Sequence, residues 1–246
     1  MEQYLLVFLV AVAATFLQTS IGFGFAVFAM IFLPLLFPYG NAIAICQAIA
    51  TLNTAYLAIR YYKYIKWKTM IPLLVPTLVL GISFTLFSFS FETHYLKALL
   101  GFVLVLLSLY FFRFSNRICI QPTIRNGMIM GSISGIGNGL FGIGGPPAAL
   151  YLLPSINEKL AYLATVQAYF TFNNITNLTT RIIKGAFQIS YLGHLAVGWI
   201  GVGVGTVLGL FAFKHMKAEL LKKFVYAFVG LNGLYIMLQE LFLPRI

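Results

Sequence analysis

The sequence predicts an all-α polytopic membrane protein built from two homologous halves, and three observations lead to this fold class. The chain of 246 residues is 61% hydrophobic and only 9% charged, whereas a soluble domain is about 25% charged. Six apolar runs are each long enough to cross a bilayer, which takes about 20 residues of helix. Two further apolar stretches are interrupted by glycine and small polar residues at corresponding places.

Along the chain, each interrupted stretch is followed by three ordinary crossings. The first interrupted stretch is 4 to 37, and its crossings are 41 to 61, 69 to 90 and 96 to 113. The second interrupted stretch is 126 to 153, and its crossings are 160 to 183, 189 to 213 and 219 to 242. This order predicts 8 to 10 helical segments in a single integral membrane domain.

The two halves align with each other when one is shifted by 120 positions. Gly, Leu and Ala often match by chance in an apolar chain. The evidence for a duplication therefore rests on the matches among Gln, Asn, Thr and Pro. Internal repeats are a frequent feature of transporters. We therefore predict a duplication, with one structural repeat in 1–120 and the other in 121–246. The aligned pairs include Gln18 with Asn138, Gly22 with Gly142, Gly24 with Gly144, Pro34 with Pro154, Gln47 with Gln167 and Thr51 with Thr171.

Each interrupted stretch either crosses the membrane once or turns back as a re-entrant hairpin. A continuous helix over 4 to 37 would be about 51 Å long at the usual rise, too long for a hydrocarbon core of about 30 Å. If both stretches are hairpins, 12 Lys and Arg residues lie on one side of the membrane and 4 on the other. If both stretches cross, the numbers are 10 and 6. The positive-inside rule favours the hairpins. We expect two half-helices per hairpin, inverted halves and both termini outside; eight through-going helices with parallel repeats are the alternative.

The two glycine-rich breaks predict a binding site for a small anion. They read Gln18-Thr19-Ser20-Ile21-Gly22-Phe23-Gly24-Phe25 and Asn138-Gly139-Leu140-Phe141-Gly142-Ile143-Gly144-Gly145-Pro146-Pro147. Glycine lets a ligand approach the main chain, and proline suits a first helical turn, so a half-helix should begin near Gly145. A helix N-terminus offers free N–H groups and a positive dipole end. Two such ends near the bilayer midplane would hold an anion without a charged side chain.

Glycine also packs membrane helices together, and this interpretation is preferred for Gly127, Gly131, Gly135 and Gly139 at four-residue spacing. A polar stripe on 160 to 183 should instead face the protein interior or a water path. Interhelical hydrogen bonds alone could explain Gln47 and Gln167, and Arg181 either snorkels to the interface or draws anions to a cavity mouth. The candidate substrate-binding residues are Gln18, Ser20, Gly22, Gly24, Gln47, Thr51, Asn138, Gly142, Gly144, Gly145, Gln167, Thr171, Asn174 and Arg181.

The composition argues against most other functions. The five acids include no Asp, and no nucleophile, base and acid stand together, so we expect no enzyme, no metal and no cofactor. Ser20, Cys46 and His194 have no companions in the sequence. The net charge of +11 lies almost wholly in short segments between apolar runs. Such charges set topology and contact lipid headgroups, so membrane lipids rather than nucleic acid are the expected partners.

Together these motifs resemble the TauE/SafE family of membrane anion exporters, of the TSUP superfamily, over about residues 5 to 240. The most specific match is Gly142-Ile143-Gly144-Gly145-Pro146 followed by Pro154. The family usually has more glycine than Gly22-Phe23-Gly24-Phe25 in the first half. The resemblance implies export of sulfite, organosulfonates or other small organic acids across the bacterial cytoplasmic membrane. An anion channel and a non-transporting membrane interaction or assembly protein are the alternatives. The substrate, the coupling ion and the oligomeric state, including a homodimer, stay open.

Overall fold

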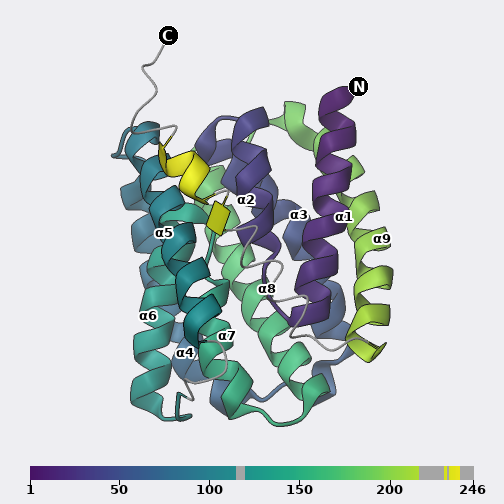
Figure 1. Ribbon diagram of the computed structural model, residues 1–246, viewed down its shortest axis with the longest axis vertical. Coiled ribbons are helices and arrows are strands. Elements are labelled where there is room, and N and C mark those ends of the chain that lie inside the picture. Colours follow the sequence, from purple (N-terminus) through teal and green to yellow (C-terminus); the bar gives the residue numbers. More distant parts are fainter. Residues whose placement is uncertain (115–119, 216–229, 232, 239–246) are drawn as a thin grey trace.

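The computed structural model describes residues 1–114, 120–215, 230–231 and 233–238. Within them the chain forms only helices, joined by short connections that include two 3₁₀ turns, Tyr62–Tyr64 and Ile189–Tyr191. The predicted all-α membrane fold is confirmed (Figure 1). The α-helices are α1 Glu2–Ile21, α2 Phe25–Leu36, α3 Tyr39–Arg60, α4 Trp67–Ser88, α5 Thr93–Phe114, α6 Ile124–Phe141, α7 Gly145–Ser155, α8 Lys159–Ile183 and α9 Leu192–His215.

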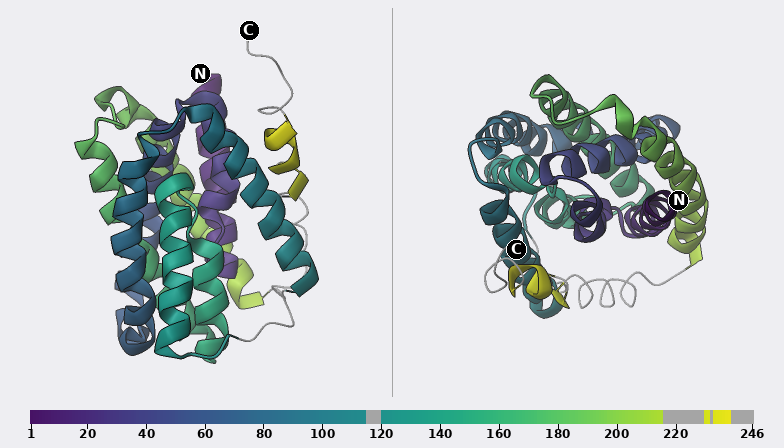
Figure 2. Two further views of the ribbon diagram at one scale, coloured as in Figure 1. Left: turned by 90° about the vertical axis from the view of Figure 1, so that its left-hand side faces the viewer. Right: turned by 90° about the horizontal axis from the view of Figure 1, so that it is seen from above.

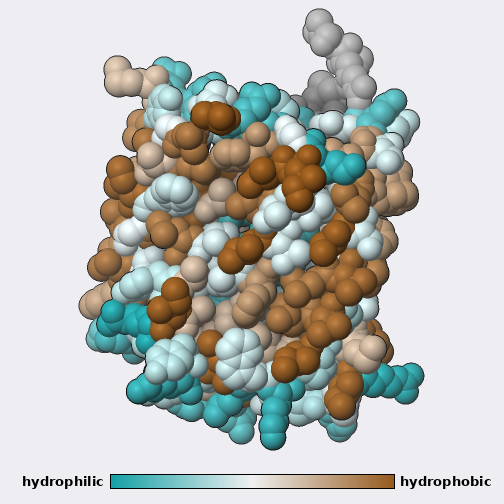
Figure 3. All heavy atoms as spheres, turned by 180° about the vertical axis from the view of Figure 1, so that it is seen from behind, coloured by the Kyte–Doolittle hydropathy of each residue, from teal (hydrophilic) through white to brown (hydrophobic). Residues whose placement is uncertain are grey.

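Several described helices have the length and composition of membrane spans. Four segments qualify on both criteria: Glu2–Ile21, Tyr39–Arg60, Trp67–Ser88 and Ile189–His215. At 25 residues α8 is also long enough, but its Asn, Gln and Thr side chains make it more polar. Figure 3 shows a broad apolar belt between two more polar ends. This belt is the surface that lipid chains would cover.

Five predicted crossings correspond to α3, α4, α5, α8 and α9. The sixth, 219 to 242, lies largely outside the described residues. Its described parts are helical, and they pack on α5, the outlying helix that leans across the bundle in Figure 2. A Cβ added at Gly101 of α5 would lie 2.8 Å from the carbonyl oxygen of Gly233. Glycine therefore allows close contact between α5 and this segment.

The first interrupted stretch folds as a helical hairpin. Gly22 and Gly24 between its arms have φ angles of 98° and 116°, a left-handed conformation that glycine adopts easily. Tyr4, near the start of α1, and Phe37, just after α2, both pack on the His194 ring, with centroids 4.3 and 5.1 Å away. The two ends of the hairpin therefore lie together. With 20 residues in α1 and 12 in α2, the arms are unequal, about 30 and 18 Å long, rather than two half-helices.

The second interrupted stretch folds in the same way from the opposite end. α6 ends before Gly142, whose φ is 73°, and α7 begins at Gly145 as predicted. The Tyr151 hydroxyl in α7 donates to the carbonyl of Thr123, just before α6, at 3.4 Å. Figure 1 shows α1 entering from the top and α6 from the bottom. The two hairpins are thus inverted relative to each other, whereas the evolutionary duplication stays a prediction.

Glycines give each hairpin a close fit against a helix of the other half. On α6, a Cβ added at Gly131 would lie 2.2 Å from the carbonyl oxygen of Leu73, and one at Gly135 would lie 2.8 Å from that of Thr77. The packing interpretation of this glycine stripe is therefore confirmed. On α9, a Cβ at Gly205 would lie 2.5 Å from the carbonyl oxygen of Val12 in α1. Membrane helices associate through such close contacts because lipid offers little hydrophobic drive.

The positive charges divide unequally between the two ends. The backbone N–H of Lys66 donates to Thr165 Oγ1 at 2.9 Å, and Lys159 Nζ donates to the carbonyl of Phe213. These bonds place the basic 60 to 68 segment, the start of α8 and the end of α9 together. Arg181 and Lys184 lie at the other end. The positive-inside rule predicts that the lysine-rich end faces the cytoplasm.

Replacing Gly205 by alanine should destabilise the protein by about 1–3 kcal/mol, because the new Cβ would overpack the α1–α9 contact. Gly203→Ala is the matched control, since a Cβ there meets nothing within 4 Å. Thermal unfolding followed by size-exclusion chromatography should show a lower midpoint for Gly205→Ala only. Equal midpoints would contradict the close contact.

The orientation can be tested by labelling single cysteines introduced at Lys63 and at Lys184, after Cys46 is replaced by alanine and Cys119 by serine. A membrane-impermeant maleimide added to intact cells should label position 184, because the positive-inside rule places that end outside. Position 63 should react only after the cells are opened. The reverse labelling pattern would show the opposite orientation. Labelling of both positions in intact cells would mean that the reagent had entered the cells.

Candidate functional site

The tips of the two hairpins meet around a small internal cavity, called here the hairpin cavity. Its volume is about 30 Å³, room for about two water molecules. α3 and α8 complete its wall. The lining residues are Gln18, Gly24, Phe25, Ala26, Val27, Ala50, Asn138, Gly142, Ile143, Gly144, Gly145, Phe170 and Asn174.

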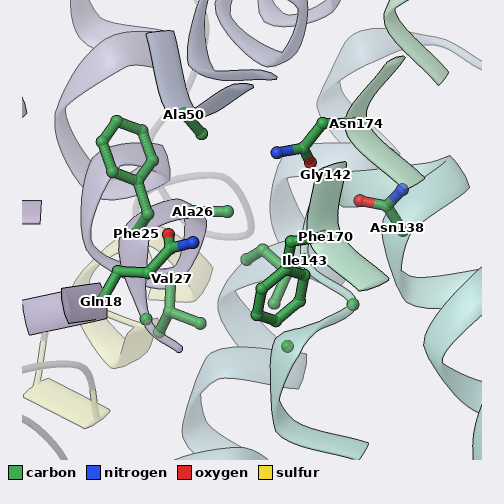
Figure 4. Close-up of a pocket in the computed structure, with 13 residues that line it drawn as sticks. Gln18, Phe25, Ala26, Val27, Ala50, Asn138, Gly142, Ile143, Phe170 and Asn174 are labelled. Atoms are coloured by element: carbon green, nitrogen blue, oxygen red, sulfur yellow. The ribbon is translucent and has the colours of Figure 1, made fainter. Parts of the chain in front are cut away.

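Three side-chain amides supply the polar part of this wall. Figure 4 shows Gln18 on one side of the cavity and Asn138 and Asn174 on the other. Gln18 Nε2 donates to Gln167 Oε1 at 3.0 Å, and Asn138 Nδ2 donates to Asn173 Oδ1 at 2.9 Å. Asn174 is 8% exposed, and its amide forms no hydrogen bond with another group in the described part of the chain. A ligand could therefore use the Asn174 N–H groups without breaking a protein contact.

The first turn of α2 adds backbone donors. The N–H of Phe28 bonds to the carbonyl of Gly24 at 3.0 Å, so the N–H groups of Phe25, Ala26 and Val27 precede the first helical bond and have no acceptor within the helix. All three residues line the cavity. Free N–H groups and the helix dipole together favour a bound anion.

The start of α7 is a weaker donor than the start of α2. Pro146 and Pro147 occupy its first turn, and proline has no N–H. Among the residues that line the cavity at this end, Gly144 and Gly145 keep their N–H groups. The two hairpin tips are therefore unequal, and α2 carries most of the backbone capacity to bind an anion.

Side chains of α8 hold the first hairpin tip in place. Gln167 accepts the bond from Gln18, and its own Nε2 donates to the carbonyl of Gly22 at 3.4 Å. The Tyr162 hydroxyl donates to the carbonyl of Ile21 at 3.5 Å. These bonds satisfy carbonyl groups that the glycine break leaves outside helical hydrogen bonding.

A second polar group holds the other tip. Ser134 Oγ on α6 donates to the carbonyl of Gly144 across the hairpin. The same hydroxyl lies 2.5 Å from the Tyr169 hydroxyl, which in turn lies 3.0 Å from Thr77 Oγ1. This chain of hydroxyls connects α4, α6 and α8 behind the cavity. It positions the tip without entering the cavity.

Gly22 and Gly144 of the breaks are packed too tightly to carry side chains. A Cβ added at Gly144 would lie 2.8 Å from Ser134 Oγ, and one at Gly22 would lie 2.7 Å from the Tyr162 ring. A bulky residue at either position would push the arms of its hairpin or α8 apart. Loss of function in such a variant would therefore reflect a disturbed fold rather than the loss of a binding contact.

The predicted site residues fall into three groups. Gln18, Gly24, Asn138, Gly142, Gly144, Gly145 and Asn174 line the hairpin cavity. Gln167 and Gly22 support it through hydrogen bonds. The remaining residues, which lie away from its wall, are Ser20, Gln47, Thr51, Thr171 and Arg181.

Each member of the third group has another environment. Ser20 donates to the carbonyl of Phe16 at 2.6 Å, and Thr51 and Thr171 donate to carbonyl groups of their own helices. Gln47 is 1% exposed, and neither polar atom of its amide has a partner among the described residues. Arg181 lies against a different cavity.

Sequence reasoning did not identify the apolar part of the wall. The starting turn of α2, Phe25 to Val27, could have been found by counting the N–H groups that follow Gly24. Phe170 lies three residues after Gln167 and four before Asn174, on the same helix face. A search for polar side chains does not find Phe170, because it is apolar. Nothing else in the sequence distinguishes it.

Comparison with known proteins connects this architecture to a transporter family. The family model described as Sulfite exporter TauE/SafE matches residues 7–236, which includes both hairpins and the helices between them. No curated protein and no solved structure matches the chain. The family match covers nearly the whole sequence, and its members are membrane transporters. The chain belongs to the sulfite exporter TauE/SafE family of multi-pass membrane proteins.

Proposed function

We propose that this chain is a secondary transporter that exports small anions from the bacterial cytoplasm, with the anion bound in the hairpin cavity. Sulfite, organosulfonates and related small organic acids are the substrate class. One observation carries this proposal: Asn174 and the first-turn residues of α2, whose N–H groups have no acceptor within the helix, line the same cavity. An oxyanion accepts several hydrogen bonds and would satisfy both sets of donors.

The neutral character of the cavity suits transport. No Lys, Arg, Asp or Glu is among its described lining residues, so binding would depend on dipoles and hydrogen bonds. Fixed dipoles of this kind hold an anion without the tight pairing that a buried cation would impose, which favours release as well as entry. An inside-negative potential supplies about 2.3 kcal/mol per charge at 100 mV for moving an anion outward.

The size of the cavity favours a carrier over an open channel. The cavity has a volume of about 30 Å³, and an organosulfonate needs more space than two water molecules. The hairpin tips must therefore separate during each cycle. Rocking of one inverted repeat against the other around a central site is a general mechanism of this kind. An open channel would carry anions without saturation or counterflow.

Asn174→Leu should lower sulfite flux by about 10- to 150-fold, because a hydrogen bond to a charged group contributes about 1.5–3 kcal/mol. The measurement is uptake and counterflow of sulfite in proteoliposomes, with sulfate, sulfoacetate and a 2-oxo acid as competitors. Thr176→Val is the matched control on the same helix. Thr176 is half-buried and is not among the residues that line the hairpin cavity, and its hydroxyl donates to the carbonyl of Phe172 in its own helix.

Several results would overturn the proposal. Full flux in Asn174→Leu would remove the hairpin cavity as the binding site. Flux that neither saturates nor shows counterflow would indicate a channel. If the folded wild-type protein moved none of these anions, the transport function itself would fail, and a non-transporting interaction protein would become the better account.

A further inference from the structure

A second and larger cavity opens at the end of the molecule opposite the lysine-rich segments. We call it the outer cavity; its volume is about 330 Å³. Its wall comes from the first turn of α3, the α4–α5 connection and the α8–α9 connection, and includes Tyr39, Phe89, Arg181 and Lys184. None of its described lining residues lines the hairpin cavity.

Arg181 is a buried cation in this wall. Its side chain is 1% exposed, and Nη2 donates to the carbonyl of Gly139 at 2.6 Å. Nε has no hydrogen-bond partner in the described part of the chain. No carboxylate among the described residues forms an ion pair with it. A buried charge normally requires a counter-charge or full hydrogen bonding, so Arg181 leaves capacity for an external anion.

Further donors face the same space from a different helix. The N–H of Ala42 bonds to the carbonyl of Pro38 at 2.8 Å, so the N–H groups of Tyr39, Gly40 and Asn41 have no acceptor within α3. The N-cap residue, Pro38, provides no side-chain cap. Lys184 adds an exposed ammonium group to the wall. Glu92, an exposed acid in the α4–α5 connection, is not one of the lining residues.

We propose that the outer cavity binds a small oxyanion, held chiefly by Arg181 and assisted by Lys184 and the first turn of α3. The positive-inside rule places this end outside. The outer cavity would therefore be the second binding site that an exported anion reaches, after the hairpin cavity. Its role in export rests on the proposed function, whereas its ability to bind an anion does not.

Arg181 also connects the two cavities. Its acceptor, the carbonyl of Gly139, lies in the last turn of α6, and Gly142 at the end of that helix lines the hairpin cavity. An anion that draws the guanidinium toward the outer cavity would weaken the bond to Gly139 and free the hairpin tip. Arrival of an anion outside would thereby be coupled to movement at the central site.

The test is sulfate binding to the purified full-length protein, measured by calorimetry at constant ionic strength. Sulfate is the probe because it does not oxidise. Arg181→Gln should weaken binding at least about tenfold, since it removes a charge-assisted contact, and Lys184→Gln about threefold by the loss of a nearby exposed charge. Arg181→Lys should retain part of the affinity. Lys97→Gln is the control, because Lys97 lies at the same end on α5 but does not line the cavity.

The hairpin cavity could contribute to the signal, so the variants are also measured in an Asn174→Leu background. Sulfate binding that persists with Asn174→Leu and disappears when Arg181→Gln is added supports the outer site, even if transport is absent. Binding that Asn174→Leu abolishes and Arg181→Gln leaves intact overturns the outer site while the proposed function stands. If Arg181→Gln aggregates, Lys184→Gln decides: unchanged affinity there overturns the proposal.

Discussion

Backbone hydrogen bonding inside the hydrocarbon core is the constraint on which the rest of this structure depends. A chain may leave helical geometry there only where protein groups satisfy the carbonyls and N–H groups that the break releases. The two glycine breaks meet this requirement through α8. Gln167 and Tyr162 bond to carbonyls at the first tip, and Arg181 bonds to Gly139 near the second. This task explains why α8, which carries more buried side-chain amides than any other described helix, is more polar than an ordinary span.

The convergence of the two tips requires helices to pack at very short range. Gly131 and Gly135 allow α6 to lie against α4, and Gly205 allows α9 to lie against α1. Each contact joins a hairpin of one half to a helix of the other half. The two halves are therefore interlocked, and in the proposed transport cycle the tips would have to separate while these glycine contacts stay in place.

The two cavities differ in how they would hold an anion. The hairpin cavity uses amide and backbone dipoles, whereas the outer cavity has Arg181 and Lys184 in its wall. In the proposed cycle, the cationic groups near the outer end would attract anions from the central site without making that site strongly binding. A neutral centre followed by a positive exit would disfavour cations at both sites. The same arrangement would allow external anions to influence the cycle through Arg181.

Much of this protein could be predicted from its sequence because the relevant signals are local. Length and hydropathy determined the membrane class, glycine breaks and charge distribution determined the two hairpins, and Pro146 and Pro147 marked the start of α7 at Gly145. The four-residue spacing of Gly127 to Gly139 determined a packing face. Each of these follows from backbone geometry within a few turns of helix. The glycine breaks also led to Gln18, Gly24 and Asn138, which line the hairpin cavity.

Only the tertiary structure decided which polar side chains share a cavity. Asn174 faces the hairpin cavity, while Thr171 on the same helix bonds to its own backbone. Gln167 and Gln47 occupy matching positions in the sequence, yet Gln167 contacts both Gln18 and Gly22 and neither polar atom of the Gln47 amide has a described partner. Arg181 belongs to a different cavity altogether. The reason is physical: a polar stripe specifies a helix face, but the rotation and tilt of that helix are set by packing against its neighbours.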